Sequence, residues 1–257
     1  RIRKDNFRGS ATLIEGREIM AKYESKVYQH GTLGMLVPGL FEGTMTVADL
    51  LKHGDWGIGT ASGLDGEMIL LDHVPYLAQS NGEIRILKPE EKVPFATVHF
   101  EEIKDSFKVE NLTQKELEDK ILADYPYKNV FFAVKIVGNF STVKTRVVEK
   151  QTRPYKTLLQ VANEQAVFES TDVSGTVIGY FAPKMFQGMA ATGYHLHFLA
   201  DNKSIGGHLL DFKIKEATIY LQPFTSIEQH LPIDNQEFLN KDLDIADMHD
   251  QIQKAEG

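Results

Sequence analysis

Residues 194–208 constrain the fold more than any other part of this chain, because their pattern predicts both a hairpin and its register. Histidines alternate with apolar side chains from Tyr194 to Phe198, as in a β-strand, and residues 201–204 have the composition of a tight turn. The residues that flank the turn should therefore pair. Counting back from this pair places His197 directly opposite His208 on the neighbouring strand.

Three histidines share one face of this predicted hairpin. His195 and His197 point the same way along a strand, and opposed residues on paired strands also share a face, with Cβ atoms about 4.5–5.5 Å apart. Gly206 and Gly207, beside His208, carry no side chains and leave room for an approaching group. Three neutral imidazoles on a rigid sheet are typical of an open zinc site, and imidazole also suits other divalent transition metals.

The composition restricts both the ligands and the partners of such a site. The 257 residues include no cysteine, so a metal has to be held by His, Asp or Glu. A hydrophobic content of 42% is typical of a soluble globular protein, and the net charge of −8 is unfavourable for nucleic-acid binding. No apolar stretch approaches the roughly 18 residues that a membrane-spanning helix needs.

The N-terminal segment and the lack of a membrane-spanning stretch predict where the protein is located. The N-terminus lacks the apolar middle region of a secretory signal, so we expect a cytoplasmic protein with no membrane partner. The sequence begins with Arg1 instead of Met, which is compatible with the removal of a leader peptide.

Glycine and proline divide the chain into many short strands and few helices. Thr46 and Thr113 are candidate helix N-caps, the second forming a capping box with Glu116, and a short helix is expected after Pro154. Strand patterns fill most of the rest. We therefore expect an α+β or α/β fold with mixed β-sheets, in two sheet-rich domains that span residues 1–130 and 131–257.

Three further candidate residues lie near predicted loops and strands. The glycine-rich stretch 57–66 is expected to be a bent loop that contains Thr60 and places Glu67 at the start of a strand. Residues 129–148 are expected to form a hairpin that turns at Gly138-Asn139 and carries Arg146 on its second strand.

The sequence resembles the alpha-acetolactate decarboxylase family over essentially its whole length. The resemblance is carried by His195-x-His197 with His208, by Gly63-Leu64-Asp65-Gly66-Glu67-Met68, by Thr145-Arg146 and by the terminal Ala255-Glu256-Gly257. It implies a two-domain α/β protein with zinc on the three histidines. It also implies a homodimer in which the N-terminal domain extends a sheet across the interface, and conversion of 2-acetolactate to (R)-acetoin and carbon dioxide.

The chemistry of these residue types fits that reaction. Loss of carbon dioxide from a β-keto acid leaves an enolate, which a metal at the ketone oxygen stabilises. For a 2-hydroxy-3-keto acid such as 2-acetolactate, this enolate is an enediolate. Arg146 has a planar fork that matches the substrate carboxylate, and Glu67 is the candidate acid that protonates the enediolate. The resemblance implies that Glu256 is a second carboxylate that ligates zinc or relays the proton. On the resemblance, Thr60 hydrogen-bonds the substrate.

Two other functions also fit part of the pattern. A cupin-like metal-dependent dioxygenase or isomerase has a similar His-x-His motif, but its expected glutamate is here Asp201, and its third histidine comes in a later, separate motif. A non-catalytic zinc-binding module would need four protein ligands, commonly including cysteine, which this chain lacks. A decarboxylase therefore fits the residues better than either alternative.

Overall fold

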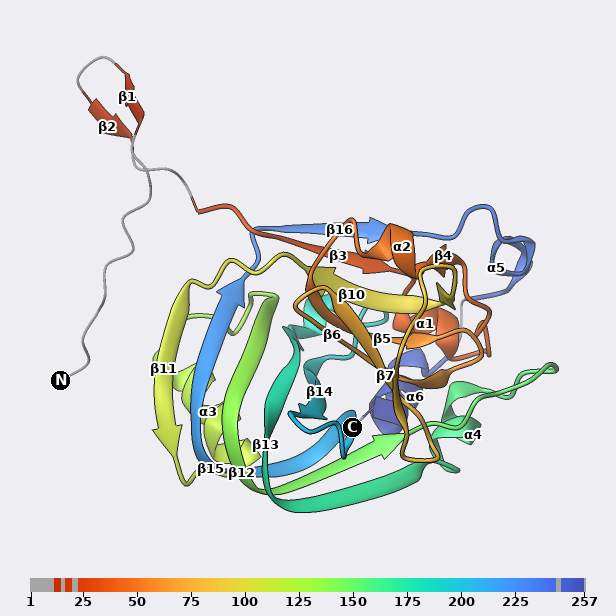
Figure 1. The fold of residues 1–257 in the computed structure, drawn as a ribbon. Coiled ribbons are helices and arrows are strands. Elements are labelled where there is room, and N and C mark those ends of the chain that lie inside the picture. The colour runs from red at the N-terminus through yellow and green to blue at the C-terminus, as the bar shows by residue number, and fades with distance from the viewer. Residues whose placement is uncertain (1–11, 15–16, 20–22, 244–245, 257) are drawn as a thin grey trace.

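Two β-sheets pack against each other in the computed structural model, which describes residues 12–14, 17–19, 23–243 and 246–256 (Figure 1). The first sheet has seven strands in the order β16-β3-β10-β5-β6-β7-β8, and only β16 and β3 are parallel. Its strands are β3 (Lys26–His30), β5 (Trp56–Ala61), β6 (Asp65–Leu71), β7 (Val74–Ala78), β8 (Ile84–Ile86), β10 (Phe95–His99) and β16 (Ser226–His230).

The second sheet has five strands in the order β11-β15-β12-β13-β14, and β14 also pairs with β15. This additional pairing closes β12, β13, β14 and β15 into a ring at one end of the sheet. The strands are β11 (Asp105–Glu110), β12 (Phe132–Val147), β13 (Ala166–Ala182), β14 (Gly193–Ala200) and β15 (Gly206–Pro223).

The helices are few and short. They are α1 (Leu33–Leu36), α2 (Val47–Leu50), α3 (Gln114–Asp124), α4 (Leu158–Ala162), α5 (Gln236–Asn240), α6 (Met248–Glu256) and the 3-10 helix η1 (Lys184–Phe186). The remaining strands are β1 (Thr12–Ile14) with β2 (Arg17–Ile19) and β4 (Met45–Thr46) with β9 (Lys92–Val93). Among the described residues, no helix is both long enough and apolar enough to cross a membrane.

Threonine caps start several of these helices. The side chain of Thr46 accepts a hydrogen bond from the Asp49 amide at the start of α2, and Thr113 forms the expected capping box with Glu116 at the start of α3. Both predicted N-caps are therefore confirmed.

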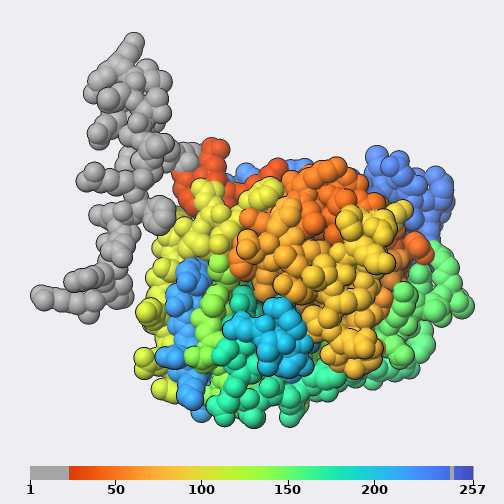
Figure 2. Space-filling view, viewed as in Figure 1, coloured from red at the N-terminus to blue at the C-terminus, as the bar shows by residue number. Residues whose placement is uncertain are grey.

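Apolar side chains from both sheets fill the space between them. Ile58 and Ile69 of the first sheet pack in one buried cluster with Ile178 and Leu199 of the second. Figure 2 shows the orange and yellow residues of the first sheet in direct contact with the green and cyan residues of the second. The expected fold class, with mixed sheets and few helices, is confirmed.

Each sheet also contains one strand from the other part of the chain, as divided at residue 130. β11 lies in the second sheet, and β16 lies at the edge of the first. The division into domains at residues 1–130 and 131–257 stays a prediction.

The hairpin expected at Gly138-Asn139 is wrong, because β12 continues through both residues. A Cβ at Gly138 would collide with the Glu216 carbonyl on β15, so glycine here allows two strands to approach closely. The register between β12 and β15 shifts between Asn139 and Phe140, so the pair marks a β-bulge in one long strand.

Neighbouring residues on β12 test this strand assignment. Ile136 is fully buried, whereas Val137 is 42% exposed. Ile136→Ala should lower the free energy of unfolding by about 2–5 kcal/mol, because it removes buried methyl groups and leaves a cavity. Val137→Ala should lower it by less than about 1 kcal/mol. Urea unfolding followed by circular dichroism measures both values, and equal losses would contradict the assignment.

Candidate metal centre and active site

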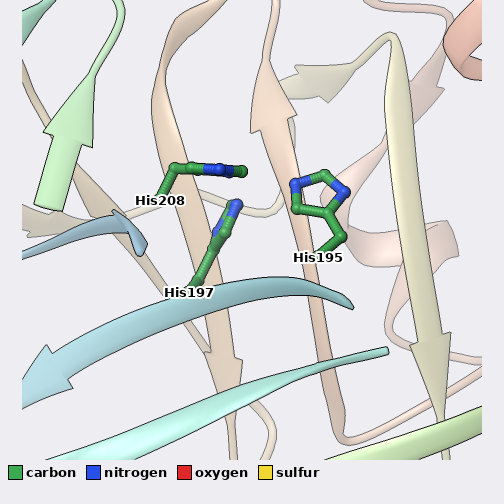
Figure 3. A group of neighbouring side chains, drawn as sticks. All are labelled: His195, His197 and His208. Carbon is green, nitrogen blue, oxygen red and sulfur yellow. The ribbon is translucent and has the colours of Figure 1, made fainter. Parts of the chain in front are cut away.

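Three imidazole rings converge at the closed end of the second sheet (Figure 3). His195 and His197 come from β14 and His208 from β15, with His197 paired directly to His208. One ligand nitrogen from each ring lies within 4.8 Å of the other two, and the ring centroids are 4.9–5.6 Å apart. The predicted hairpin register is confirmed, and these buried histidines could hold a metal ion.

The room expected beside His208 is already filled. Gly207 has a φ of +139°, and a Cβ there would lie 2.6 Å from the Arg146 carbonyl oxygen. Its missing side chain therefore lets β12 approach β15, which places Arg146 next to His208 in the strand register.

Burial keeps the three imidazoles neutral, the form that binds metals. It lowers the pKa of His195 to about 3, and the Arg146 charge adds to this effect. Burial also lowers the pKa of His197 and of His208 well below the ordinary value, and the Arg146 charge adds to the effect in both cases.

One hydrogen bond sets the tautomer of His197. Its Nδ1 lies 2.9 Å from the carbonyl oxygen of Met68 on β6, and a carbonyl can only accept, so Nδ1 carries the proton. Its Nε2 is buried without a hydrogen-bond partner. A ring held through one nitrogen, with the other free and facing two more imidazoles, is the usual arrangement of a metal ligand.

Two carboxylates approach this trio from different parts of the chain. Glu67 Oε2, on β6, lies 3.5 Å from His197 Nε2. Glu256 Oε2, on α6, lies 3.5 Å from His195 Nε2 and 3.7 Å from His208 Nδ1. These separations exceed normal hydrogen-bond lengths, so the carboxylates flank the imidazoles without pairing tightly.

The environment of each carboxylate favours its protonated form. Burial raises the pKa of Glu67 to about 8; the Glu256 charge adds to this shift and Arg146 opposes it. Burial also raises the pKa of Glu256, again against the effect of Arg146. A buried carboxyl that holds its proton near neutral pH can act as a general acid.

Arg146 stands beside the carboxylates on β12 and is 5% exposed. Its Nη1 donates a hydrogen bond of 2.8 Å to Gln165 Oε1, and its Nη2 lies 3.5 Å from Glu256 Oε2. Its Nε is buried and has no hydrogen-bond partner. Part of the guanidinium is therefore available to a ligand.

Thr60 lies on β5, not in a loop, so the loop expected over residues 57–66 is wrong except at residues 62–64, the turn between β5 and β6. A Cβ at Gly57 or Gly59 would collide with β10, which means that these glycines allow close strand pairing. The Thr60 hydroxyl donates a hydrogen bond of 2.7 Å to the Gly66 carbonyl, which ties β5 to the bend before Glu67.

A single cavity of about 480 Å³, its mouth included, joins these groups. Six of the seven predicted site residues line it: Thr60, Glu67, Arg146, His195, His197 and Glu256. The rest of its wall is mainly apolar and includes Leu36 of α1, Leu158 of α4 and Ala255 of α6. The cavity thus combines polar side chains that could bind a charged ligand with apolar side chains that are unfavourable for water.

The model of the alpha-acetolactate decarboxylase family matches residues 27–245. The chain belongs to this family. The alpha-acetolactate decarboxylase of Streptococcus thermophilus is 39% identical over 90% of this chain and 98% of that protein. That of Klebsiella aerogenes is 35% identical over 93% of both.

Solved structures lead to the same family. The alpha-acetolactate decarboxylase of Bacillus subtilis strain 168 superposes with a TM-score of 0.88 at 32% identity, covering 91% of this chain and 100% of that chain. A Staphylococcus aureus protein of unknown function, described as similar to alpha-acetolactate decarboxylase, has the same TM-score at 38% identity, over 90% of this chain and 100% of that chain. As a member of the alpha-acetolactate decarboxylase family, the chain is an enzyme of the carboxy-lyase class.

Helix α6 brings Glu256 to the cavity of this decarboxylase-family protein. Ile252 and Ala255 of α6 are buried against α1 and α4. Gln253 Nε2 donates a hydrogen bond of 3.0 Å to Thr192 Oγ1, just before β14. Packing and this bond hold the tail that sequence reasoning could place only by resemblance.

Sequence reasoning missed two features of the site. It did not identify Gln165, whose only signal is its position just before a strand, or the apolar wall contributed by α1. A helix of four residues such as α1 is too short to show a helical pattern.

The pKa of Glu67 predicts a pH-dependent stability of the metal-free protein. Between its ordinary value of 4.5 and about 8, the folded state holds a proton that the unfolded state releases, so this contribution to stability falls as pH rises. Glu67→Gln removes that dependence. Its free energy of unfolding relative to the native protein should therefore increase between pH 5 and pH 9, measured by urea unfolding after chelator treatment.

Glu91 provides the matched control. Its pKa is lowered by its hydrogen bonds to Arg85, so its contribution changes only at more acidic pH. Glu91→Gln should differ from the native protein by a constant amount from pH 5 to pH 9. Parallel curves for Glu67→Gln and the native protein would contradict the assignment of a raised pKa to Glu67.

Proposed function

We propose that this enzyme decarboxylates 2-acetolactate to (R)-acetoin and carbon dioxide with zinc held by His195, His197 and His208. Three neutral imidazoles converge beside a cavity that Arg146 and two carboxyl groups line, and this arrangement carries the proposal. Zinc suits three imidazoles in a site with further positions open, although other divalent transition metals bind the same ligands. When bound, the metal supplies Lewis-acid stabilisation of the oxygen on which negative charge develops.

Arg146 binds the substrate carboxylate in this proposal. Its charge is buried, and Nε has no partner, so a carboxylate can complete its hydrogen bonds. Holding the carboxylate fixes the C–C bond that breaks relative to the metal ligands. The apolar wall at Leu36 and Leu158 surrounds the reacting groups and keeps water away from them.

Glu67 donates the proton that completes acetoin. Its raised pKa keeps it protonated near neutral pH, and it lies beside His197 in the wall of the cavity. Glu256 is the second carboxylate, and its contacts with His195, His208 and Arg146 fit either a metal ligand or a proton relay. Thr60 lines the same cavity and is proposed to contact the substrate.

The assembly and location of the protein remain predictions of the sequence. A homodimer formed by extension of the N-terminal sheet is consistent with a first sheet that ends at β16 and β8 among the described strands. Participation in acetoin biosynthesis follows from the proposed product. The cytoplasmic location is likewise proposed.

An acetoin assay with and without chelator tests the proposed function. The purified protein should contain about one zinc per chain, release acetoin from racemic 2-acetolactate and lose this activity on chelation. His197→Ala should lose the metal, whereas the matched control His53→Ala, outside the cavity, should retain both metal and activity. Zinc without turnover would favour a non-catalytic module, and iron with oxygen consumption would favour a cupin-like enzyme.

Arg146→Ala tests the carboxylate-binding role separately. We expect it to keep its metal and lose about 100-fold or more in kcat/KM, because a buried charge partner of the substrate is removed. Arg153→Ala is the matched control, since Arg153 is exposed and pairs with Glu42 and Glu237. Metal analysis and steady-state kinetics measure these effects, and metal loss in Arg146→Ala would contradict the assigned role.

A further inference from the structure

We propose that Gln165 is a positioning residue for Arg146, whose guanidinium it fixes without neutralising the charge. The inference rests on the proposed function, in which Arg146 binds the substrate carboxylate. It concerns a residue outside the cavity lining, in the connection between α4 and β13.

The strand register brings the two side chains together. Arg146 on β12 pairs with Val167 on β13, and Gln165 precedes Val167 by two residues. Gln165 therefore occupies the diagonal position next to Arg146, a distance that long side chains bridge. The bond from Arg146 Nη1 to Gln165 Oε1 is 2.8 Å long, whereas the contact from Nη2 to Glu256 is 3.5 Å.

The remaining edge of the guanidinium points to a ligand. With Nη1 engaged by Gln165, the Nε–Nη2 edge contains an Nε that is buried and unpartnered. Buried donors in folded proteins nearly always have partners, so an orphan donor in a cavity wall indicates a group that binds later. Nε and Nη2 offer two parallel donors, which match the two oxygens of a carboxylate.

An amide suits this position better than a carboxylate would. Gln165 Oε1 accepts a hydrogen bond but carries no charge, so it does not neutralise the positive charge of Arg146. In a buried site this charge attracts a carboxylate more strongly than it would in water. A glutamate at residue 165 would instead form an ion pair with Arg146 and compete with the substrate carboxylate.

The surrounding structure holds Gln165 in place. Leu158, Val161 and Ala162 of α4 are buried in the cluster that also packs α6. The Glu164 amide donates a hydrogen bond of 3.0 Å to the Val161 carbonyl at the end of α4. The short helix that contributes to the apolar cavity wall thus also fixes the residue that orients Arg146.

Gln165→Met and Gln165→Glu test the inference. Methionine keeps the length and packing of the side chain but cannot accept the hydrogen bond effectively. We expect Gln165→Met to raise KM for 2-acetolactate about tenfold, as for the loss of one hydrogen bond to a charged group, with kcat changed less. Gln165→Glu should raise KM further, because it adds a competing carboxylate. Gln236→Met is the matched control, since Gln236 is exposed on α5 and does not line the cavity.

Two probe molecules separate positioning from general damage to the site. Calorimetric titration of zinc-loaded protein should show about tenfold weaker binding of 2-hydroxy-2-methylpropanoate, which has a carboxylate, in Gln165→Met. Binding of butane-2,3-diol, which has none, and the zinc content should be unchanged. Unchanged carboxylate binding, or equal losses for both probes, would overturn the inference.

The same titrations distinguish failure of the inference from failure of the proposed function. If Arg146→Ala weakens carboxylate binding but Gln165→Met does not, only the role of Gln165 is wrong. If Arg146→Ala leaves carboxylate binding unchanged, the proposed role of Arg146 fails and the role of Gln165 fails with it. In an Arg146→Ala background, Gln165→Met should have no further effect on carboxylate binding, and an additive loss would overturn the coupling.

Discussion

The pairing of β14 with β15 is the constraint on which the site depends. It sets His197 opposite His208, and β15 continues this register to Arg146 on β12. A slip of one residue in a strand moves its side chains to the other face, so it would remove a histidine from the trio. Closure of the second sheet into a ring supports the register, because β14 is held by β13 on one side and β15 on the other.

Charge balance in the cavity follows from where the sheets place each group. Burial disfavours every charge there, which leaves the imidazoles neutral and favours protonated carboxyl groups. Arg146 is the charged exception, and it opposes the pKa increase of both Glu67 and Glu256. A cation held by the histidines would act in the same direction as Arg146, so metal binding and carboxylate ionisation are coupled.

Local sequence patterns predicted the parts of the molecule that local interactions determine. The turn and the alternation around His197 were sufficient for the hairpin register, and Thr113 with Glu116 for a helix start. Gly138-Asn139 was misinterpreted because a turn and a β-bulge use the same residue types, and only β15, far along the chain, distinguishes them. Gln165 gave no local signal beyond its position just before a strand, since its role depends on the pairing of β13 with β12.

The contact between His197 and Met68 links the two sheets to the chemistry of the site. The Met68 carbonyl belongs to β6 of the first sheet, and it selects the His197 nitrogen that faces the other imidazoles. The preceding residue on that strand is Glu67, so one strand sets both the tautomer of a candidate ligand and the position of the candidate acid. The two functions therefore depend on the same packing between sheets. A shift of β6 that displaced Glu67 would also release His197, which makes assembly of the metal site inseparable from placement of the acid.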